Sequence, residues 1–166
     1  MLNTHTLGLD IGCGDNKRVG FIGVDIKRTK AVDVVADARN LPFRDCVFDH
    51  VYSSHLIEHF SHKEIKSVLA EWVRVLKKGG VLEIRCPDLR ARAFLFFLNP
   101  SWQNVINIYG GQDYTGNYHK CGFSYNLLKD LLESCGIIKV KRVIKIKGYK
   151  NLPFIPEDLH VKGIKL

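Results

Sequence analysis

The sequence predicts one α/β domain, residues 1–166, built on a doubly wound and mostly parallel sheet of about seven strands. Three observations lead to this prediction. At 166 residues the chain is long enough to bury a sizeable core. Short apolar strands alternate with helical patterns, which favours parallel pairing. Several of these strands are apolar on both faces, as expected for a sheet that is covered on both sides.

The expected strands come in a fixed order along the chain. The first half carries them at Thr6–Ile11, Gly20–Ile26, Ala31–Asp37, Val47–Ser54 and Gly80–Asp88. Only a few residues join the first three strands, so the helices between strands one and two and between two and three are reduced. A sheet face left bare in this way exposes apolar surface, which predicts a homodimer or another partner on that face. Two more strands are expected at Ile137–Ile146 and at His160–Leu166, the last of them antiparallel.

Helical periodicity is clearest between the fourth and fifth strands. A helix is expected over Ser61–Lys78, where apolar residues form one stripe: Ile65, Val68, Leu69, Trp72, Val73 and Leu76. The sequence "SHKE" is a capping box at its start, and "KKGG" supplies cations and glycine at its end. A second helix begins at Ser124, buries Leu127, Leu128, Leu131 and Leu132, and stops at Gly136. Helices are also expected at Leu89–Leu98 and Trp102–Tyr109.

Composition limits the setting of the protein. The five cysteines are scattered, with no C-x-x-C pair, which indicates reduced thiols rather than a disulfide framework or a zinc site. The N-terminal sequence "MLNTHTLGLD" lacks the charged and apolar regions of a signal peptide. No apolar run approaches the length of a membrane span. We therefore expect a cytoplasmic protein without a membrane span.

The net charge of +8 is unevenly distributed. The segment Lys139–Lys150, "KVKRVIKIKGYK", is rich in basic residues and has no acidic residue. A basic patch of this kind can attract nucleic acid. Lysines also block unwanted pairing on a solvated edge strand. We favour the edge strand.

The stretch "LGLDIGCGDN", Leu7–Asn16, is an apolar run that ends in a bare glycine turn, where a ligand can approach the backbone closely. The phosphate loop G-x-x-x-x-G-K-[ST] is absent. The dinucleotide fingerprint is broken, because Lys17 stands at its third glycine. S-adenosylmethionine has no phosphate and needs close backbone and strand-end carboxylates. Asp10, Asp25 and Asp37 lie at the ends of the first three strands and supply these carboxylates.

With these residues the chain resembles the class I, Rossmann-like methyltransferases that depend on S-adenosylmethionine. "LDIGCGDN" resembles the family's glycine motif, "VDI" its ribose acid, "ADARNLPF" its adenine-side acid, "FDHVYSSHLIEH" its fourth-strand motif, and "LKKGGVLEIRCPD" the approach to strand five. The likeness covers nearly the whole chain, although Asn16 replaces the motif's third glycine. It implies that S-adenosylmethionine is bound by Asp10, Gly12, Cys13, Gly14, Asp25, Ile26, Asp37, Ala38, Ser54 and His55.

The segment "YGGQDYTGNYHKCGFS", Tyr109–Ser124, is the best acceptor-side candidate, because it is long, glycine-rich and aromatic. His119 stands where many family members carry a histidine. It is expected either to act as a general base or acceptor-binding group, or to hold the loop through a backbone hydrogen bond, and we weigh these two roles equally. His55 is the second catalytic candidate. A metal site from His55 and His59 is conceivable at their i, i+4 spacing, but a structural role is favoured and no metal is expected.

The acceptor is the least constrained part of the prediction. The fourth strand ends in "SSHLIEH" rather than [DNS]-P-P-[YFW], which disfavours methylation of a base amino group. Compact, type-11-like members of the family resemble the methyltransferases associated with glycan biosynthesis. This likeness implies O-methylation of a small sugar-type acceptor, with nucleic acid less favoured. The alternatives are an RNA methyltransferase that uses the basic C-terminal tail, and a partner subunit that binds the cofactor without catalysis.

Overall fold

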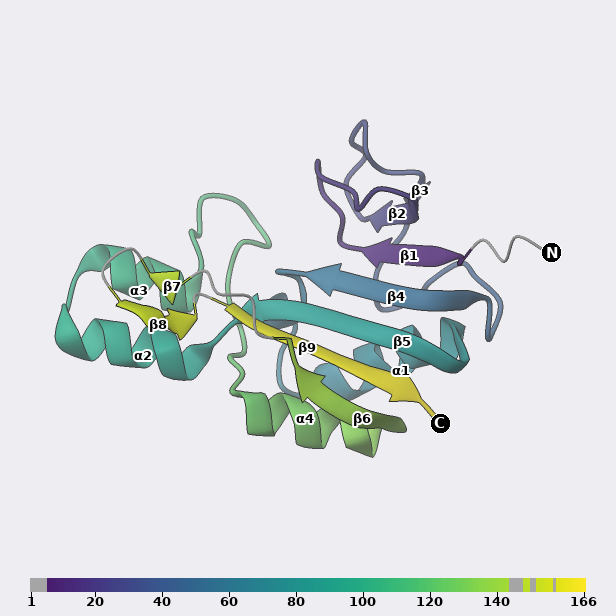
Figure 1. Ribbon diagram of the computed structural model, residues 1–166. Helices are drawn as coiled ribbons and strands as arrows, with labels where there is room; N and C mark the ends of the chain where they lie inside the picture. The colour runs from purple at the N-terminus through teal and green to yellow at the C-terminus, as the bar shows by residue number, and fades with distance from the viewer. Residues whose placement is uncertain (1–5, 144–147, 150–151, 157) are drawn as a thin grey trace.

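The computed structural model describes residues 6–143, 148–149, 152–156 and 158–166. One seven-stranded sheet forms its centre, in the order β3-β2-β1-β4-β5-β9-β6 (Figure 1). The strands from β1 to β5 pair in parallel, and β9 runs antiparallel to both β5 and β6. The predicted architecture is therefore confirmed. The strands span Gly8–Ile11 (β1), Phe21–Asp25 (β2), Val34–Val35 (β3), Phe48–Ser54 (β4), Leu76–Pro87 (β5), Ile137–Arg142 (β6) and Asp158–Lys165 (β9).

The helices lie where periodicity and capping residues place them. They are the short 3₁₀ helix η1 (Ile57–His59) and the helices α1 (Ile65–Val75), α2 (Leu89–Leu98), α3 (Trp102–Tyr109) and α4 (Tyr125–Ser134). Helix α1 packs against β5, and α4 packs against β6 and β9. Helices α2 and α3 pack on each other beyond one end of the main sheet (Figure 1). The structure has no helix at 12–20 or 26–33, as predicted, and adds a separate hairpin of β7 (Gly148–Tyr149) and β8 (Leu152–Pro156).

The predicted helix over Ser61–Lys78 is too long at both ends. At its start, Glu64 Oε2 accepts the Ser61 backbone N–H at 3.1 Å, which is one half of the expected capping box. At its end, β5 begins at Leu76, so the segment "KKGG" belongs to a strand. The final carbonyls of the helix are capped from far away instead, because Lys165 Nζ donates to Val73 O and Leu76 O at 2.7 Å each. A lysine from β9 thus replaces the local cap.

The buried core lies between the sheet and α1 and α4. Trp72 of α1 is fully buried, and its Nε1–H donates to Ala38 O at 3.0 Å. In α4, Leu128 and Leu132 are buried as predicted, whereas Leu127 is 60% exposed. Leu127 is the third residue after the N-cap Ser124 and lies in the first turn of the helix. The hydrogen bond from the Trp72 indole fixes the loop that follows β3, and Ala38 in this loop lines the pocket described below.

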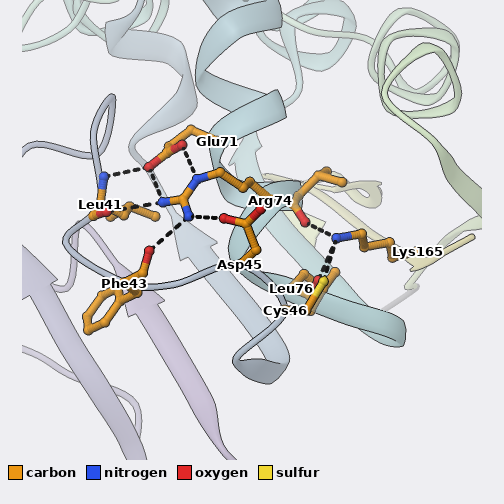
Figure 2. Close-up of polar contacts among 9 residues, drawn as sticks. Leu41, Phe43, Asp45, Cys46, Glu71, Arg74, Leu76 and Lys165 are labelled. Carbon is orange, nitrogen blue, oxygen red and sulfur yellow. Dashed lines mark hydrogen bonds and ion pairs between the residues drawn. The ribbon is translucent and has the colours of Figure 1, made fainter.

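Arg74 holds the same loop to α1 (Figure 2). Its guanidinium forms a two-point pair with Glu71, at 2.7 and 2.8 Å, and also donates to the carbonyls of Phe43 and Leu41. Asp45 accepts a further bond at 2.6 Å. These bonds raise the pKa of Arg74, mainly through Glu71 and next through Asp45. The loop between β3 and β4 is therefore pinned at several carbonyls by one side chain.

Two predictions made from composition agree with the structure. All five cysteines are free thiols, as expected. Strand β6 is an edge of the main sheet, and its Lys139 and Lys141 are exposed, as the edge-strand interpretation of Lys139–Lys150 predicts. Residues 144–147 and 150 of that segment lie outside the described residues. Among the helices that the structure describes, none combines the length and apolar character needed to cross a membrane.

Candidate cofactor pocket and acceptor site

A pocket of about 150 Å³ opens where β1 and β2 end. In a doubly wound sheet, ligands bind outside the carboxyl ends of the strands. The wall combines the glycine turn, the end of β2, the loop after β3 and the segment around η1. Its lining residues are Ile11, Gly12, Val24, Asp25, Ile26, Ala36, Asp37, Ala38, Arg39, Leu56, His59 and Phe60.

The glycine turn has a backbone that only glycine adopts easily. Gly12 has φ +72°, and a Cβ on it would lie 2.7 Å from Leu56 Cδ2. Its N–H donates to Val24 O at 2.8 Å, which ties the turn to β2. Gly14 has φ +52°, and no heavy atom lies within 4 Å of where its Cβ would be. The turn therefore leaves open space at this end of the sheet, as a bound ligand requires.

Asp25 ends β2 with its carboxylate already oriented. Oδ2 accepts the Gly14 N–H at 3.0 Å, and Oδ1 accepts the Lys27 N–H at 2.9 Å. Each oxygen keeps a lone pair for another donor, such as a ribose hydroxyl. Ile26 follows directly and is 64% exposed although it is apolar, so it offers a flat apolar surface at the wall of the pocket. These two residues suit a nucleoside.

Asp37 lines the pocket, but its carboxylate is ion-paired with Arg39. Arg39 Nη2 and Nε donate to the Asp37 carboxylate at 2.6 and 3.0 Å, and the Arg39 N–H adds a bond at 2.9 Å. Arg39 thereby holds the pKa of Asp37 below its usual range. The sequence did not indicate this pairing. Asp37 reaches the pocket as an ion pair with Arg39 rather than as an isolated acid.

Two residues predicted to bind the cofactor, Asp10 and Cys13, do not belong to the pocket lining. Asp10 is buried, and its Oδ2 accepts the Arg18 N–H at 2.7 Å, while burial raises its pKa. The thiol of Cys13 lies against Gly23 of β2, and burial raises its pKa to about 11. Neither side chain lines the pocket. Asp10 instead holds the backbone that follows the glycine turn, and Cys13 packs the turn against β2.

Ser54 and His55 also lie outside the pocket lining. His55 adopts φ +52°, and its Nε2 lies 3.2 Å from Asp158 Oδ2 on β9. Glu58 Oε1 lies 3.5 Å from its Nδ1. Asp158 first and Glu58 second raise the pKa of His55 to about 9. A pKa raised in this way favours the protonated ring at neutral pH, which disfavours a general-base role for His55.

His119 lies in the loop between α3 and α4, which rises at the end of the sheet toward which β1 and β4 point (Figure 1). Its Nδ1 lies 3.1 Å from Ile108 O, and its ring packs edge-on against His59 at 5.3 Å between centroids. His59 lines the pocket, so His119 lies one side chain behind the wall. Burial lowers the pKa of His119, which keeps the ring neutral near pH 7. Both alternatives for His119 stay open: it holds the loop, and its second nitrogen remains available.

The sequence analysis missed several residues of the site. Arg39, Leu56 and Phe60 line the pocket without having been predicted. His59 was considered only as a metal ligand together with His55 or as a structural residue, and Glu58 was given no role. Glu58 is 1% exposed. A carboxylate within the otherwise apolar run "LIEHF" was the available signal, because acids are buried only for a specific reason.

The chain was compared with protein-family profiles and with solved structures. Residues 9–84 match the family profile described as a methyltransferase domain. The matched segment is 76 of the 166 residues of the chain. A solved S-adenosylmethionine-dependent methyltransferase from Archaeoglobus fulgidus has the same fold, with a TM-score of 0.64 and 21% identity over 95% of this chain and 85% of that one. The predicted fold of the class I methyltransferases is confirmed by this likeness. The profile match agrees with the predicted activity and with S-adenosylmethionine as its cofactor.

Curated relatives match over a shorter region. The chain is 40% identical over 94 residues to a probable tRNA methyltransferase 9B of Mus musculus, which is 48% of this chain and 21% of the relative. It is 38% identical over 91 residues to a tRNA (carboxymethyluridine(34)-5-O)-methyltransferase of Arabidopsis thaliana, which is 46% of this chain and 22% of the relative. The match thus spans about a fifth of the length of these relatives.

These relatives correct one prediction. The sequence analysis preferred a small-molecule acceptor and placed nucleic acid second. The relatives found are tRNA methyltransferases, and none of them is named for glycan synthesis. The preference was therefore wrong, and the likeness to glycan-associated methyltransferases is not supported. It failed because compactness of the domain carries no information about which acceptor the loops receive.

Proposed function

We propose that this protein transfers a methyl group from S-adenosylmethionine to an oxygen atom of an RNA, with tRNA as the first candidate. The observation that carries the proposal is the identity of 38–40% to tRNA methyltransferases over nearly half of the chain. The segment that the family profile matches, residues 9–84, forms most of the pocket wall. The net charge of +8 supports a polyanionic partner.

The rim of the pocket has the chemistry that single-stranded RNA requires. Tyr114 and Tyr118 are 51% and 45% exposed in the loop between α3 and α4. Lys27 Nζ lies 3.8 Å from the Tyr114 ring centroid, and Tyr118 O lies 3.1 Å from His59 Nδ1. Both tyrosines are thus tied to residues at or beside the pocket. Exposed aromatic rings stack on unpaired bases, and nearby lysines attract phosphates.

Methyl transfer is an in-line displacement. An acceptor oxygen attacks the methyl carbon of the sulfonium, the carbon–sulfur bond breaks, and its electron pair stays on sulfur to give S-adenosylhomocysteine. The protein contributes mainly proximity and alignment. The Arabidopsis relative is named for an oxygen of carboxymethyluridine. A carboxylate acceptor is already ionised and needs no base, whereas a hydroxyl acceptor must lose its proton.

The experiment uses tritiated methyl-S-adenosylmethionine and unfractionated tRNA. We expect wild-type protein to place label in the RNA, and Asp25→Ala to place far less at limiting cofactor. Nuclease digestion should release the label, and mild alkali should release it as methanol if the acceptor is a carboxylate. Label that stays on a nucleoside through alkali indicates a ribose or base position. Absence of label in any RNA, with cofactor binding intact, overturns the proposal.

A further inference from the structure

A second group of side chains lies at the pocket wall beside His59. One ligand atom from each of Glu58, His59 and His119 lies within 4.8 Å of the other two. Glu58 and His59 come from η1, and His119 comes from the loop before α4. The backbone joins these segments, because Lys120 N–H and Cys121 N–H both donate to Glu58 O, at 2.8 and 3.1 Å. The three side chains therefore come from two segments that are held side by side.

Glu58 has an unsatisfied carboxylate at the centre of this group. Its side chain is 2% exposed, and neither oxygen accepts a hydrogen bond from the residues that the structure describes. The nearest described cation is His55, whose Nδ1 lies 3.5 Å from Oε1. That distance is longer than a normal charged hydrogen bond. A buried carboxylate costs several kcal/mol unless it is paired or coordinates a metal, so Glu58 has capacity for another positive partner.

Both histidines are fixed in the tautomer that a metal requires. His59 Nδ1 lies 3.1 Å from Tyr118 O, and His119 Nδ1 lies 3.1 Å from Ile108 O. A carbonyl oxygen only accepts, so each Nδ1 carries the hydrogen. In a neutral ring the lone pair is then on Nε2. Metal-bound histidines characteristically donate their other ring N–H to a backbone carbonyl or a carboxylate, which orients the ring.

We propose that Glu58, His59 and His119 form a binding site for one divalent transition-metal ion. Two imidazoles and one carboxylate are a donor set for Zn²⁺, Fe²⁺, Mn²⁺ or Co²⁺ rather than for Mg²⁺ or Ca²⁺, which prefer oxygen ligands. Such an ion binds these atoms at about 2.0–2.2 Å and leaves other positions open. Closing the site requires the ligand atoms to approach by roughly an ångström from a 4.8 Å spread.

The site lies on the acceptor side of the domain. His59 lines the cofactor pocket, and His119 lies in the loop that carries the exposed tyrosines. An ion held there has open positions for an oxygen of the acceptor, which it would orient toward the methyl group. This role rests on the proposed methyl transfer to an oxygen, whereas metal binding itself does not. The two are separable, because metal binding can be measured without cofactor or RNA.

The test is a titration of the tag-free, chelator-stripped chain with Co²⁺, read by its visible absorption, and with Zn²⁺ by calorimetry. We expect one ion per chain. Glu58→Gln and His119→Asn should each weaken binding at least roughly tenfold, because each removes one of three ligands. Glu58→Gln keeps the shape of a buried side chain, and His119→Asn tests the site from a different segment if the first variant misfolds.

The matched control is His62→Ala. His62 is exposed, lies close to the site in sequence and is not one of the three ligands. It should bind metal as the wild type does. Wild-type protein that binds neither ion overturns the proposal. Binding that survives both Glu58→Gln and His119→Asn in folded protein also overturns it, because other groups, such as the free cysteines, then hold the ion. Loss of methyl transfer alone, with metal binding intact, counts only against the proposed function.

Discussion

Replacing Asp25 by alanine should weaken cofactor binding strongly, because its carboxylate is oriented before the ligand arrives. The Gly14 and Lys27 N–H groups hold the two oxygens at 3.0 and 2.9 Å. A preoriented acceptor loses little side-chain entropy on binding. One charge-assisted hydrogen bond contributes about 1.5–3 kcal/mol. Its loss corresponds to a roughly 10- to 150-fold increase in Kd.

The assay is calorimetric titration with S-adenosylhomocysteine, which binds without turnover. Asp25→Asn should lie between wild type and alanine, because it keeps one acceptor oxygen but loses the charge. The matched control is Asp15→Ala, an exposed acid in the same turn that does not line the pocket. Circular dichroism and the melting temperature show whether each variant is folded. A folded Asp25→Ala protein with a Kd within about twofold of wild type, a change below 0.5 kcal/mol, refutes the reasoning.

Three further outcomes are expected. Arg74→Ala should lower the free energy of unfolding, measured by urea titration, by about 2–4 kcal/mol. The change leaves Glu71 without its cation and removes the hydrogen bond to the Phe43 carbonyl. A decrease of less than about 1 kcal/mol contradicts this expectation. Burial raises the pKa of Glu83, but hydrogen bonds with His160, His50, Lys162 and Arg18 outweigh it and hold the pKa well below the usual 4.5. Its stabilisation is therefore full above about pH 4.5 and falls as the pH drops further, and Glu83→Gln should flatten that acid limb. Tyr114→Ala should weaken RNA binding by about 1–3 kcal/mol, while Tyr114→Phe retains it; equal affinities exclude stacking there.

Features of the sequence that act locally predicted most of the fold. Apolar runs ending in acids placed the ends of β1 and β2, and the cap Ser124 placed the start of α4. The end of α1 was predicted wrongly because Lys165, which caps it, is far away in sequence. A cap that is close in sequence can be recognised from the sequence, whereas a capping residue from a distant segment cannot.

The same difference explains what was predicted of the site. Gly12, Asp25, Ile26, Asp37 and Ala38 were predicted and line one pocket, because consecutive parallel strands end at the same edge. The pairing of Asp37 with Arg39 depends on one rotamer. The group of Glu58, His59 and His119 joins segments about sixty residues apart, through a backbone contact that no periodicity encodes. Such a group could be found only in three dimensions.

The most direct test of the central claim is a crystal structure of the chain with S-adenosylhomocysteine. We predict that the ribose hydroxyls bind the Asp25 carboxylate, that the adenine lies against Ile26, and that the sulfur faces the loop that carries His119. This arrangement would place the methyl group of the substrate beside the proposed RNA-binding rim. Cofactor bound elsewhere, or bound here with its ribose away from Asp25 and its sulfur away from that loop, would contradict the account.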